Sequence, residues 1–378
     1  MRGATMGKTA TVGVALLALL CGGAWAQQGA AVYGIIDVGV QWNKQYASST
    51  NQQASVWSID SGYQSGSRFG LRGSEPLGGT FAAIYQLEGG FDVSTGQSTQ
   101  GGTLFGRQAW AGLQGRLGQL VAGRLATPSS GTGSFDMWAS VDPFAAGFGI
   151  NQSGSTFVAA NALRQDNAVL YVTPALDGFK GAAGYSFNRG GSETAPQDGN
   201  SNATTLAASY GAGAFYAVLT YDILGYPAGG SANANAGYPD EKLLQFGATL
   251  DLKVVKLHGA WADQSNISAV RAGVSIAPPA GIVAYDNQAW MAGVSMPIGR
   301  GLLMASYQYA NASNVGYVGA GGPANFEPDY TVWGLAYTYT MSKQTNVYLG
   351  YGQVSAKGTL DSTQLDRQQA AFGLRYRF

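Results

Sequence analysis

Apolar and polar residues alternate along most of the chain with a period of two. The stretch AVYGIIDVGVQW (31–42) sets Val32, Ile36 and Val40 on one face and Asp37 and Gln41 on the other. The same pattern recurs in KLLQFGATL (242–250), LLMASYQYAN (302–311), NVYLGYG (346–352) and the ending AAFGLRYRF (370–378). This period predicts β-strands with one apolar and one polar face.

About sixteen such segments of roughly ten residues each follow one another, and this is the length that a tilted strand needs to cross a bilayer. We expect them to start near residues 30, 66, 79, 104, 118, 165, 178, 203, 213, 241, 254, 285, 301, 329, 344 and 368.

The connections between these segments alternate between short and long. Short ones are expected at 74–79, 115–118, 173–178, 211–214, 296–301 and 340–344. Long ones, rich in Gly, Ser and Asn, are expected at 43–65, 92–103, 127–164, 188–203, 224–240, 265–284, 311–328 and 355–367. Tight turns at one rim and long loops at the other are typical of outer-membrane barrels.

An even number of strands places both chain termini at the short-turn rim of the barrel. The last strand, with Phe372, Tyr376 and Phe378 on its apolar face, is therefore expected to pair with the first strand and close the barrel. Its terminal aromatic ring suits the membrane interface.

Composition favours this fold class over the alternatives. Glycine supplies 57 of 378 residues, about 15%, whereas average proteins contain roughly 7%. Charged residues supply only 11%, whereas average soluble proteins contain roughly 25%. Low charge with dispersed apolar residues does not suit a disordered chain. A soluble β-sandwich is the other all-β alternative, but the Gly, Ser, Gln, Asn and Arg of the second face would not build a dry interior. The sequence therefore predicts a transmembrane antiparallel up-and-down β-barrel.

The first 26 residues differ from the rest. Arg2 and Lys8 precede and flank an apolar run from Thr9 to Leu20, and Ala24 and Ala26 are small residues at the positions that a signal peptidase reads. We predict a signal peptide at 1–26 and a barrel domain at 27–378. No later stretch of about 18 apolar residues exists, which excludes a helical membrane protein. The remaining chain has 19 basic and 21 acidic residues, no cysteine and nothing that attracts nucleic acid.

Several blocks carry a family resemblance. SRFGLRGSEPLGGTFAAIYQLEGGFDVSTGQ (67–97), LFGRQAWAGLQGRLGQLVAGRLATP (104–128), DNAVLYVTPALDGFKGAAGYSFN (166–188) and FGLRYRF (372–378) closely resemble Gram-negative trimeric general-diffusion porins of the β-proteobacterial type. The resemblance covers the whole chain after the signal peptide and is weakest in the long loops.

The resemblance implies a homotrimer of sixteen-stranded barrels in the outer membrane, in contact with lipids and lipopolysaccharide. Each barrel would hold a water-filled pore for ions and small hydrophilic solutes. The third long loop, here about 127–164, would fold inward and narrow the pore. It is the longest expected connection, and a long loop within a compact fold is usually functional.

The alternation of strand faces indicates which charged side chains line the pore. Arg68 and Arg72 share one strand face while Phe69 and Leu71 share the other, and an arginine facing lipid would cost roughly 2–4 kcal/mol at mid-bilayer. We therefore expect both arginines in the lumen. The same rule sends Arg107 inward and Trp110 outward, and it places Gln108 outward as well.

Carrying the family's basic cluster over by motif nominates Arg68, Arg107 and Arg164. The facing acids would be Asp136 and Asp142 of the constriction loop, and Arg72, Arg124, Glu88 and Asp37 would be further pore-lining residues. Cations on one wall and anions on the other would create a transverse field that favours polar solutes. The alternative for Arg72 and Arg124 is that they bind carbonyls and acids and so fix the loop.

Other functions have little support. An outer-membrane enzyme needs a base beside a nucleophile, but His258 is the only histidine and has no acid beside it in its strand. We therefore predict no enzyme and no cofactor or metal. A transporter with a plug is disfavoured because strands begin directly after the signal peptide. A surface-recognition barrel, or adhesin, using the long outer loops stays an alternative, and acids at 238–240 and 326–330 stay open as weak calcium ligands. The sequence favours a passive channel with mild anion selectivity.

Overall fold

The strands are those of one large antiparallel sheet. The computed structural model describes residues 30–47, 52–153, 156–157, 164–193, 195, 199–226, 239–268, 282–317, 329–357 and 366–378. The signal peptide predicted at 1–26 lies outside these residues. The described residues contain seventeen strands and one short 3-10 helix, η1 (Gly149–Asn151).

Most strands start within a few residues of the predicted positions. They are β1 (Ala31–Ala47), β2 (Gln52–Ser61), β3 (Arg68–Gly78), β4 (Phe81–Gly90), β5 (Gln108–Gly115), β6 (Gly118–Ala126), β7 (Arg164–Val172), β8 (Phe179–Ser186), β9 (Ala203–Ala212), β10 (Phe215–Leu224), β11 (Glu241–Asp251), β12 (Lys256–Ser268), β13 (Ile282–Ile298), β14 (Gly301–Tyr317), β15 (Asp329–Thr340), β16 (Thr345–Lys357) and β17 (Arg367–Arg377).

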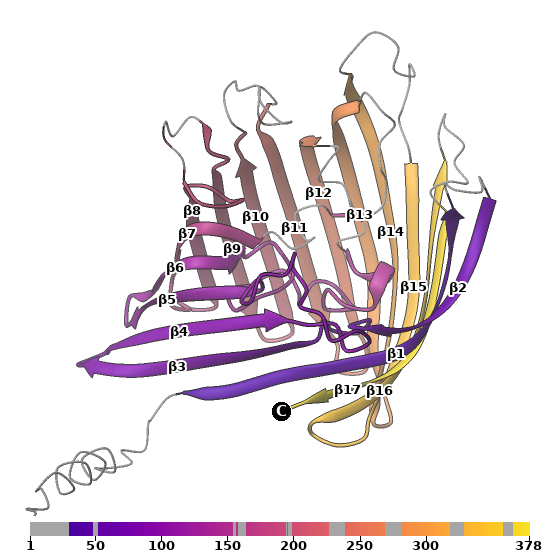
Figure 1. The fold of residues 1–378 in the computed structure, drawn as a ribbon, viewed down its shortest axis with the longest axis horizontal. Coiled ribbons are helices and arrows are strands. Elements are labelled where there is room, and N and C mark those ends of the chain that lie inside the picture. Colours follow the sequence, from indigo (N-terminus) through magenta and orange to yellow (C-terminus); the bar gives the residue numbers. More distant parts are fainter. Residues whose placement is uncertain are drawn as a thin grey trace, which may run out of the picture.

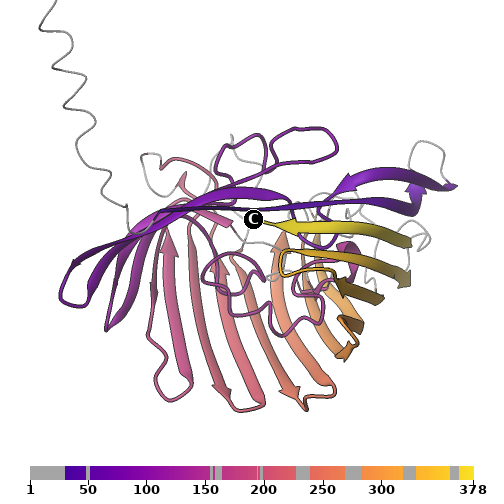
Figure 2. The same ribbon diagram turned by 90° about the horizontal axis from the view of Figure 1, so that it is seen from below.

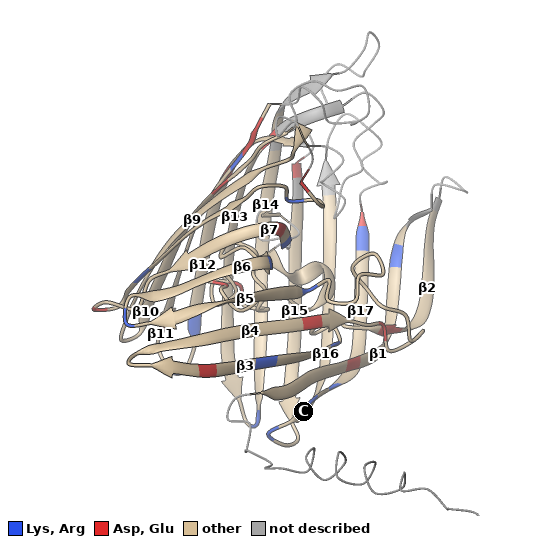
Figure 3. Ribbon diagram, turned by 60° about the vertical axis from the view of Figure 1, so that its left-hand side comes forward, with Lys and Arg blue, Asp and Glu red and all other residues tan. Residues whose placement is uncertain are grey.

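The sheet closes on itself. From β3 to β17 each strand pairs with the next strand in the sequence, and β1 pairs with β17 from Ile35 opposite Arg377 to Gln45 opposite Arg367. β3 pairs with 31–35 of β1, and β2 pairs with 38–47 of the same strand. β2 and β3 therefore occupy one position in the wall. The wall then has sixteen positions, as predicted. The closed barrel is confirmed (Figures 1 and 3).

The connection expected at 43–65 is wrong in part. β1 continues to Ala47, and β2 occupies 52–61 as its hairpin partner. Ser and Gln are frequent in this stretch, which gives it a loop-like composition. Strand pairing with β1 overrides this local preference.

The two strand faces meet different surroundings. Large apolar side chains on the outer face are exposed, as at Phe69 (42%), Leu71 (40%) and Phe372 (60%), whereas inward polar side chains such as Gln245 and Gln308 are fully buried. An apolar outer face and a polar interior are what a barrel in lipid requires. In the described part, no helix is long and apolar enough to cross a membrane.

The described part of the chain between β6 and β7, residues 127–153 and 156–157, lies inside the ring of strands (Figures 1 and 2). It packs around its own buried aromatic side chains, among them Trp138, Phe144 and Phe157. Glycines in the wall make room for it: a Cβ at Gly247 would lie 2.5 Å from Val141, and a Cβ at Gly293 would lie 2.4 Å from Pro143. Part of the unusual glycine content therefore serves the close approach of this segment to the wall.

Candidate pore constriction

Beside the candidate constriction, the wall position shared by β2 and β3 is interrupted. Between β2 and β3, residues 62–67 leave the sheet, and Gly62 starts this detour with a φ of 81° that favours glycine. Tyr63 and Gln64 become buried, and Tyr63 stacks on Tyr348 of β16 with ring centroids 5.8 Å apart. The backbone N–H of Gly149 donates to the Tyr63 carbonyl at 3.1 Å. The 62–67 detour thus supports the loop between β6 and β7 at its Gly149 backbone.

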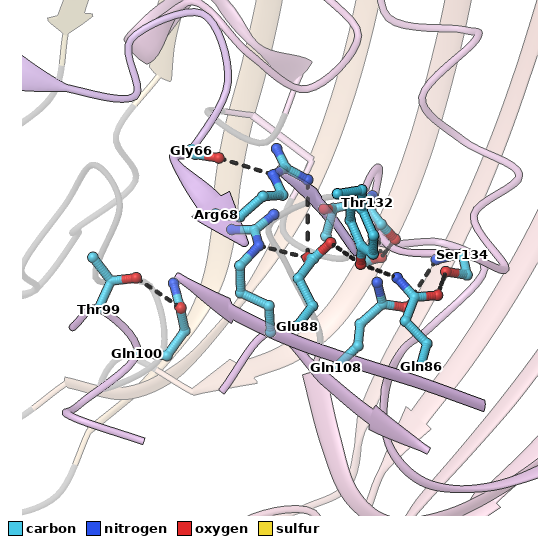
Figure 4. A network of polar contacts seen from close by, with 12 residues as sticks. Gly66, Arg68, Gln86, Glu88, Thr99, Gln100, Gln108, Thr132 and Ser134 are labelled. Atoms are coloured by element: carbon cyan, nitrogen blue, oxygen red, sulfur yellow. Dashed lines mark hydrogen bonds and ion pairs between the residues drawn. The ribbon is translucent and has the colours of Figure 1, made fainter. Parts of the chain in front are cut away.

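Arg68 and Arg107 converge on the carboxylate of Glu88, and Figure 4 shows Arg68 beside Glu88. Arg107 Nε donates to Glu88 Oε1 at 2.7 Å, and an Arg68 Nη lies 4.0 Å from the same oxygen. Arg68 Nε also donates to the Gly66 carbonyl at 2.9 Å. Glu88 is 4% exposed, so it neutralises part of the basic cluster and does not face the water as a free charge.

A chain of hydrogen bonds links this cluster to the loop (Figure 4). Tyr33 donates its hydroxyl proton to Glu88 Oε2 at 2.8 Å and accepts a hydrogen bond from Gln86. Ser134 of the loop donates to the Gln86 amide oxygen, and its backbone N–H donates to Gln108 Oε1 at 3.0 Å. The loop is therefore fixed to the wall beside the arginines.

The three arginines nominated by motif line one cavity. A space of ≈ 340 Å³ is bounded by Arg68 of β3, Arg107 just before β5, Arg164 at the start of β7 and Asp136 of the loop. Arg164 Nε is buried and has no hydrogen-bond partner among the described residues. The structure thus brings three cations and one loop carboxylate to the same opening.

Asp136 is the loop acid at this opening. Its carboxylate accepts the backbone N–H groups of Trp138 at 3.1 Å and Ala139 at 2.9 Å. Burial raises the pKa of Asp136 to about 6, although these backbone donors oppose the rise. Its negative charge is therefore only partly retained in mildly acidic solution.

Asp142 does not face the arginines, contrary to prediction. It is 2% exposed and accepts the backbone N–H groups of Phe144 at 2.9 Å and Ser153 at 2.7 Å. Burial raises its pKa, and these donors oppose the rise. Asp142 organises the fold of the loop, because two turns of the loop need an acceptor at this point.

Asp37 also differs from its prediction as a pore-lining charge. It is fully buried behind the 62–67 detour, where it accepts the Ser65 backbone N–H at 2.7 Å and the Tyr348 hydroxyl at 2.6 Å. Alternation placed it correctly on the inner face, but the detour separates it from the lumen.

Gln108 and Trp110 point inward, so their predicted outward placement is wrong. Gln108 bonds to the loop as described, and Trp110 lies against Phe135 of the loop with ring centroids 4.9 Å apart. Arg107 precedes β5, so the two-residue alternation does not extend to it. Arg107 and Gln108 can therefore both lie inside.

The other nominated arginines have different environments. Arg124 donates from Nε to the Gly106 carbonyl at 2.8 Å and forms an ion pair with Asp166 of β7. It thus binds a carbonyl and an acid, but neither of them belongs to the constriction loop. Arg72 is exposed and lies over the Tyr33 ring, with Cζ 5.2 Å from its centroid.

His258 is held on both ring nitrogens. Nδ1 lies 2.9 Å from the Val141 carbonyl of the loop, and Nε2 lies 2.9 Å from Ser295 Oγ. Besides Gln86, Gln108 and His258, further wall side chains form hydrogen bonds with the loop; they are Tyr216, Gln245, Asn287, Gln308 and Gln369. His258 thus anchors the loop from the opposite wall.

The closing strand places its aromatic residues on the outer face. Phe372 pairs with Val40, and Tyr376 pairs with Ile36. The Phe378 backbone N–H donates to the Gly34 carbonyl at 3.1 Å, and the Gly34 N–H donates to the Phe378 carbonyl at 3.1 Å.

The described residues contain no cluster of three His, Cys, Asp or Glu side chains that suits a metal ion. The acids at 238–240 and 326–330 are the possible calcium ligands noted above. These two stretches lie partly outside the described residues and partly at their edge.

The sequence interpretation missed the contribution of 62–67 and of Tyr33 and Gln86. The signal was available in GYQSGS (62–67), which places glycines and serines between two alternating segments. Such a stretch inside a strand pattern favours a bulge or a detour.

Comparisons with known proteins agree on the family. Residues 13–359 match the sequence profile of the Gram-negative porin family. An outer membrane porin protein of Bordetella pertussis is 33% identical over 98% of this chain and 100% of its own length.

Two solved structures share the fold. The anion-selective porin from Comamonas acidovorans has a TM-score of 0.69 at 20% identity, covering 92% of this chain and 99% of its own. The trimer form of the outer membrane protein OmpT from Vibrio cholerae has a TM-score of 0.61 at 15% identity, covering 93% of this chain and 100% of its own.

Proposed function

The chain belongs to the Gram-negative porin family and forms an outer-membrane channel for passive diffusion of ions and small hydrophilic solutes, and we propose that Arg68, Arg107 and Arg164 make this channel mildly anion-selective. The observation that carries the proposal is the cavity in which these three cations meet a single loop carboxylate, Asp136. Glu88 offsets part of the charge, which leaves a basic surplus at the opening. The structurally similar Comamonas protein is named as an anion-selective porin, which supports the same sign.

The channel is proposed to assemble as a homotrimer. The trimer form of the similar Vibrio protein supports this assembly, and the exposed apolar outer face suits both neighbouring subunits and outer-membrane lipids and lipopolysaccharide. We keep the prediction that the chain is not an enzyme, because both ring nitrogens of His258 are already engaged. The adhesin alternative rests on outer loops that lie mostly outside the described residues.

Ion selectivity is tested in planar bilayers by the zero-current potential under a KCl gradient. We expect a chloride-leaning potential and triplet conductance steps. Arg68→Gln or Arg164→Gln should each lower the chloride-to-potassium permeability ratio by roughly two- to fivefold, since a unit charge at contact distance in water is worth about 1 kcal/mol.

Lys343→Gln, in the turn between β15 and β16, is the matched control and should leave the ratio unchanged. A potassium-leaning potential in the wild type would contradict anion selectivity and transfer control to Asp136. A folded barrel without conductance would contradict the channel itself.

A further inference from the structure

A second cavity lies in the wall on the short-turn side of the constriction. It has a volume of ≈ 400 Å³ and is lined by residues of β3 to β6, by Ala31 of β1 and by the loop residues Ser134 and Phe135. Its wall residues include Gln114 and Gln119, which flank the short turn between β5 and β6. Arg72 lies four residues beyond Arg68 on the same face of β3, so it is roughly 13 Å farther along the strand.

The Arg72 guanidinium is positioned but uncommitted. Its place above the Tyr33 ring fixes its direction by a cation–π contact. No hydrogen bond or ion pair of Arg72 is found in the described part of the chain, in contrast to Arg68, Arg107 and Arg124. Glu88 is already bound by Arg107 and Tyr33, and Glu75 stands three residues along the strand, on the opposite face. The donors of Arg72 are therefore available to a dissolved anion.

The rest of the cavity is partly apolar. Ile84 packs against the buried cluster that contains Trp110 and Phe135. The Trp110 indole N–H is directed to Gln108 Oε1 at 3.3 Å, so the indole offers mainly apolar surface. Gln119 donates to Gln114 at 3.2 Å, which adds amide groups at the rim. A cation at one end and an apolar floor beside it fit an anion with an apolar body.

We propose that this cavity is a subsite for small amphipathic carboxylates, in which Arg72 binds the carboxylate and Ile84 and the edge of Trp110 contact the apolar body. The subsite rests on the proposed passage of anions through the lumen, and it is distinct from the constriction. An inorganic anion would gain nothing from the apolar floor, and a neutral solute would gain nothing from the guanidinium. The cavity size lies within the usual range for small-molecule sites.

Benzoate and acetate test the proposal because they share the carboxylate and differ in the apolar body. Each is added to either side of a wild-type channel in a bilayer, and the reduction of the KCl current is measured. Benzoate should reduce the current at a concentration about tenfold lower than acetate, the equivalent of one good contact.

Arg72→Gln should raise the blocking concentration of benzoate by about tenfold, as expected for the loss of one charge-assisted contact. Ile84→Ser should weaken the block by benzoate and leave that by acetate unchanged. Lys343→Gln, in the turn between β15 and β16, is the matched control away from the cavity and should change neither. Heat-dependent gel migration verifies that each variant is folded.

Equal block by acetate and benzoate would overturn the subsite. So would a benzoate block that survives Arg72→Gln but disappears in Arg68→Gln, because the anion would then bind at the constriction. A wild type without chloride preference that still shows an Arg72-dependent benzoate block would overturn the selectivity proposal and leave the subsite intact.

Discussion

At the scale of single residues, the constriction combines permanent and titratable charge. Arg68, Arg107 and Arg164 stay cationic in ordinary conditions, whereas Asp136 has a pKa raised to about 6 by burial. Because this pKa is raised, the carboxylate is charged above about pH 6 and takes up a proton below it. The net positive charge of the opening should therefore increase as the pH falls.

The pH dependence of selectivity is a direct consequence. The chloride-to-potassium permeability ratio should rise between about pH 7.5 and about pH 5, with a midpoint near the pKa of about 6. Asp136→Asn should show a higher ratio at neutral pH and little change with pH. Burial also raises the pKa of Asp142, but this residue is 2% exposed and does not line the opening, so it should contribute little. A dependence that persists unchanged in Asp136→Asn would assign it to another group.

Alternation predicts a side chain's face well inside a strand and poorly at its ends. It placed Arg68 and Arg72 opposite Phe69 and Leu71, and both apolar residues are exposed on the outer wall. It misplaced Trp110 because the count was carried through Arg107, which lies outside β5. It also gave Asp37 the correct face without the detour that covers it, since a contact between residues 28 positions apart is not encoded in periodicity.

At the scale of elements, the interruption between β2 and β3 positions the constriction. Asp37 holds Ser65, and the Gly66 carbonyl holds the Arg68 guanidinium. Arg375 of β17 adds a bond from its guanidinium to Ser65 Oγ at 2.8 Å. The 62–67 detour is therefore fixed by side chains from β1 and β17, the two strands whose pairing closes the barrel.

Asp37→Asn should destabilise this element. The substitution removes the charge that strengthens two buried hydrogen bonds, so we expect a loss of about 2–4 kcal/mol in the free energy of unfolding. Tyr348→Phe, which removes only one of the bonds, should cost about 1 kcal/mol. Urea unfolding followed by tryptophan fluorescence measures both. Equal stability of Asp37→Asn and wild type would show that the Asp37 charge does not hold the detour.

The elements themselves were largely predictable. In β13 and β14, an alternating pattern and a short turn between the strands leave little freedom in register from Asp286 opposite Ser313 to Ile298 opposite Gly301, and the register shifts only beyond that point. The path of the loop within 127–164 was not predictable from its composition. Its course depends on Asp142, Ser153 and wall residues more than a hundred positions away, such as His258.

At the scale of the whole molecule, closure of the ring depends on the pairing of β1 with β17. Every backbone group at this seam would otherwise face lipid without a partner. The seam ends in the two reciprocal bonds between Gly34 and Phe378.

Deletion of Phe378 should weaken the closed barrel. It removes two backbone hydrogen bonds, which are together worth about 2 kcal/mol at an interface that water reaches. The temperature at which the folded band disappears in gel electrophoresis should fall. Phe378→Leu, which keeps the backbone bonds, should change it much less. If both variants lose the same thermal stability, the aromatic ring and not the backbone closes the end of the seam.

The anchoring of the loop by side chains from many strands has a consequence for sequence evolution. Gln245 reaches the carbonyl of Ser129, Gln308 that of Asn151, and Asn287 that of Thr156. These wall residues bind loop backbone, and the loop side chains at two of the same points are held as well. The Asn151 amide donates to the Tyr351 carbonyl at 3.0 Å, and Thr156 Oγ1 donates to Gln308 Oε1 at 2.7 Å. Apposed pairs such as Gly247 with Val141 and Gly293 with Pro143 leave no spare volume. In an alignment of homologues, these pairs should therefore covary in size, whereas the backbone-binding amides should be retained together with Asn151 and Thr156.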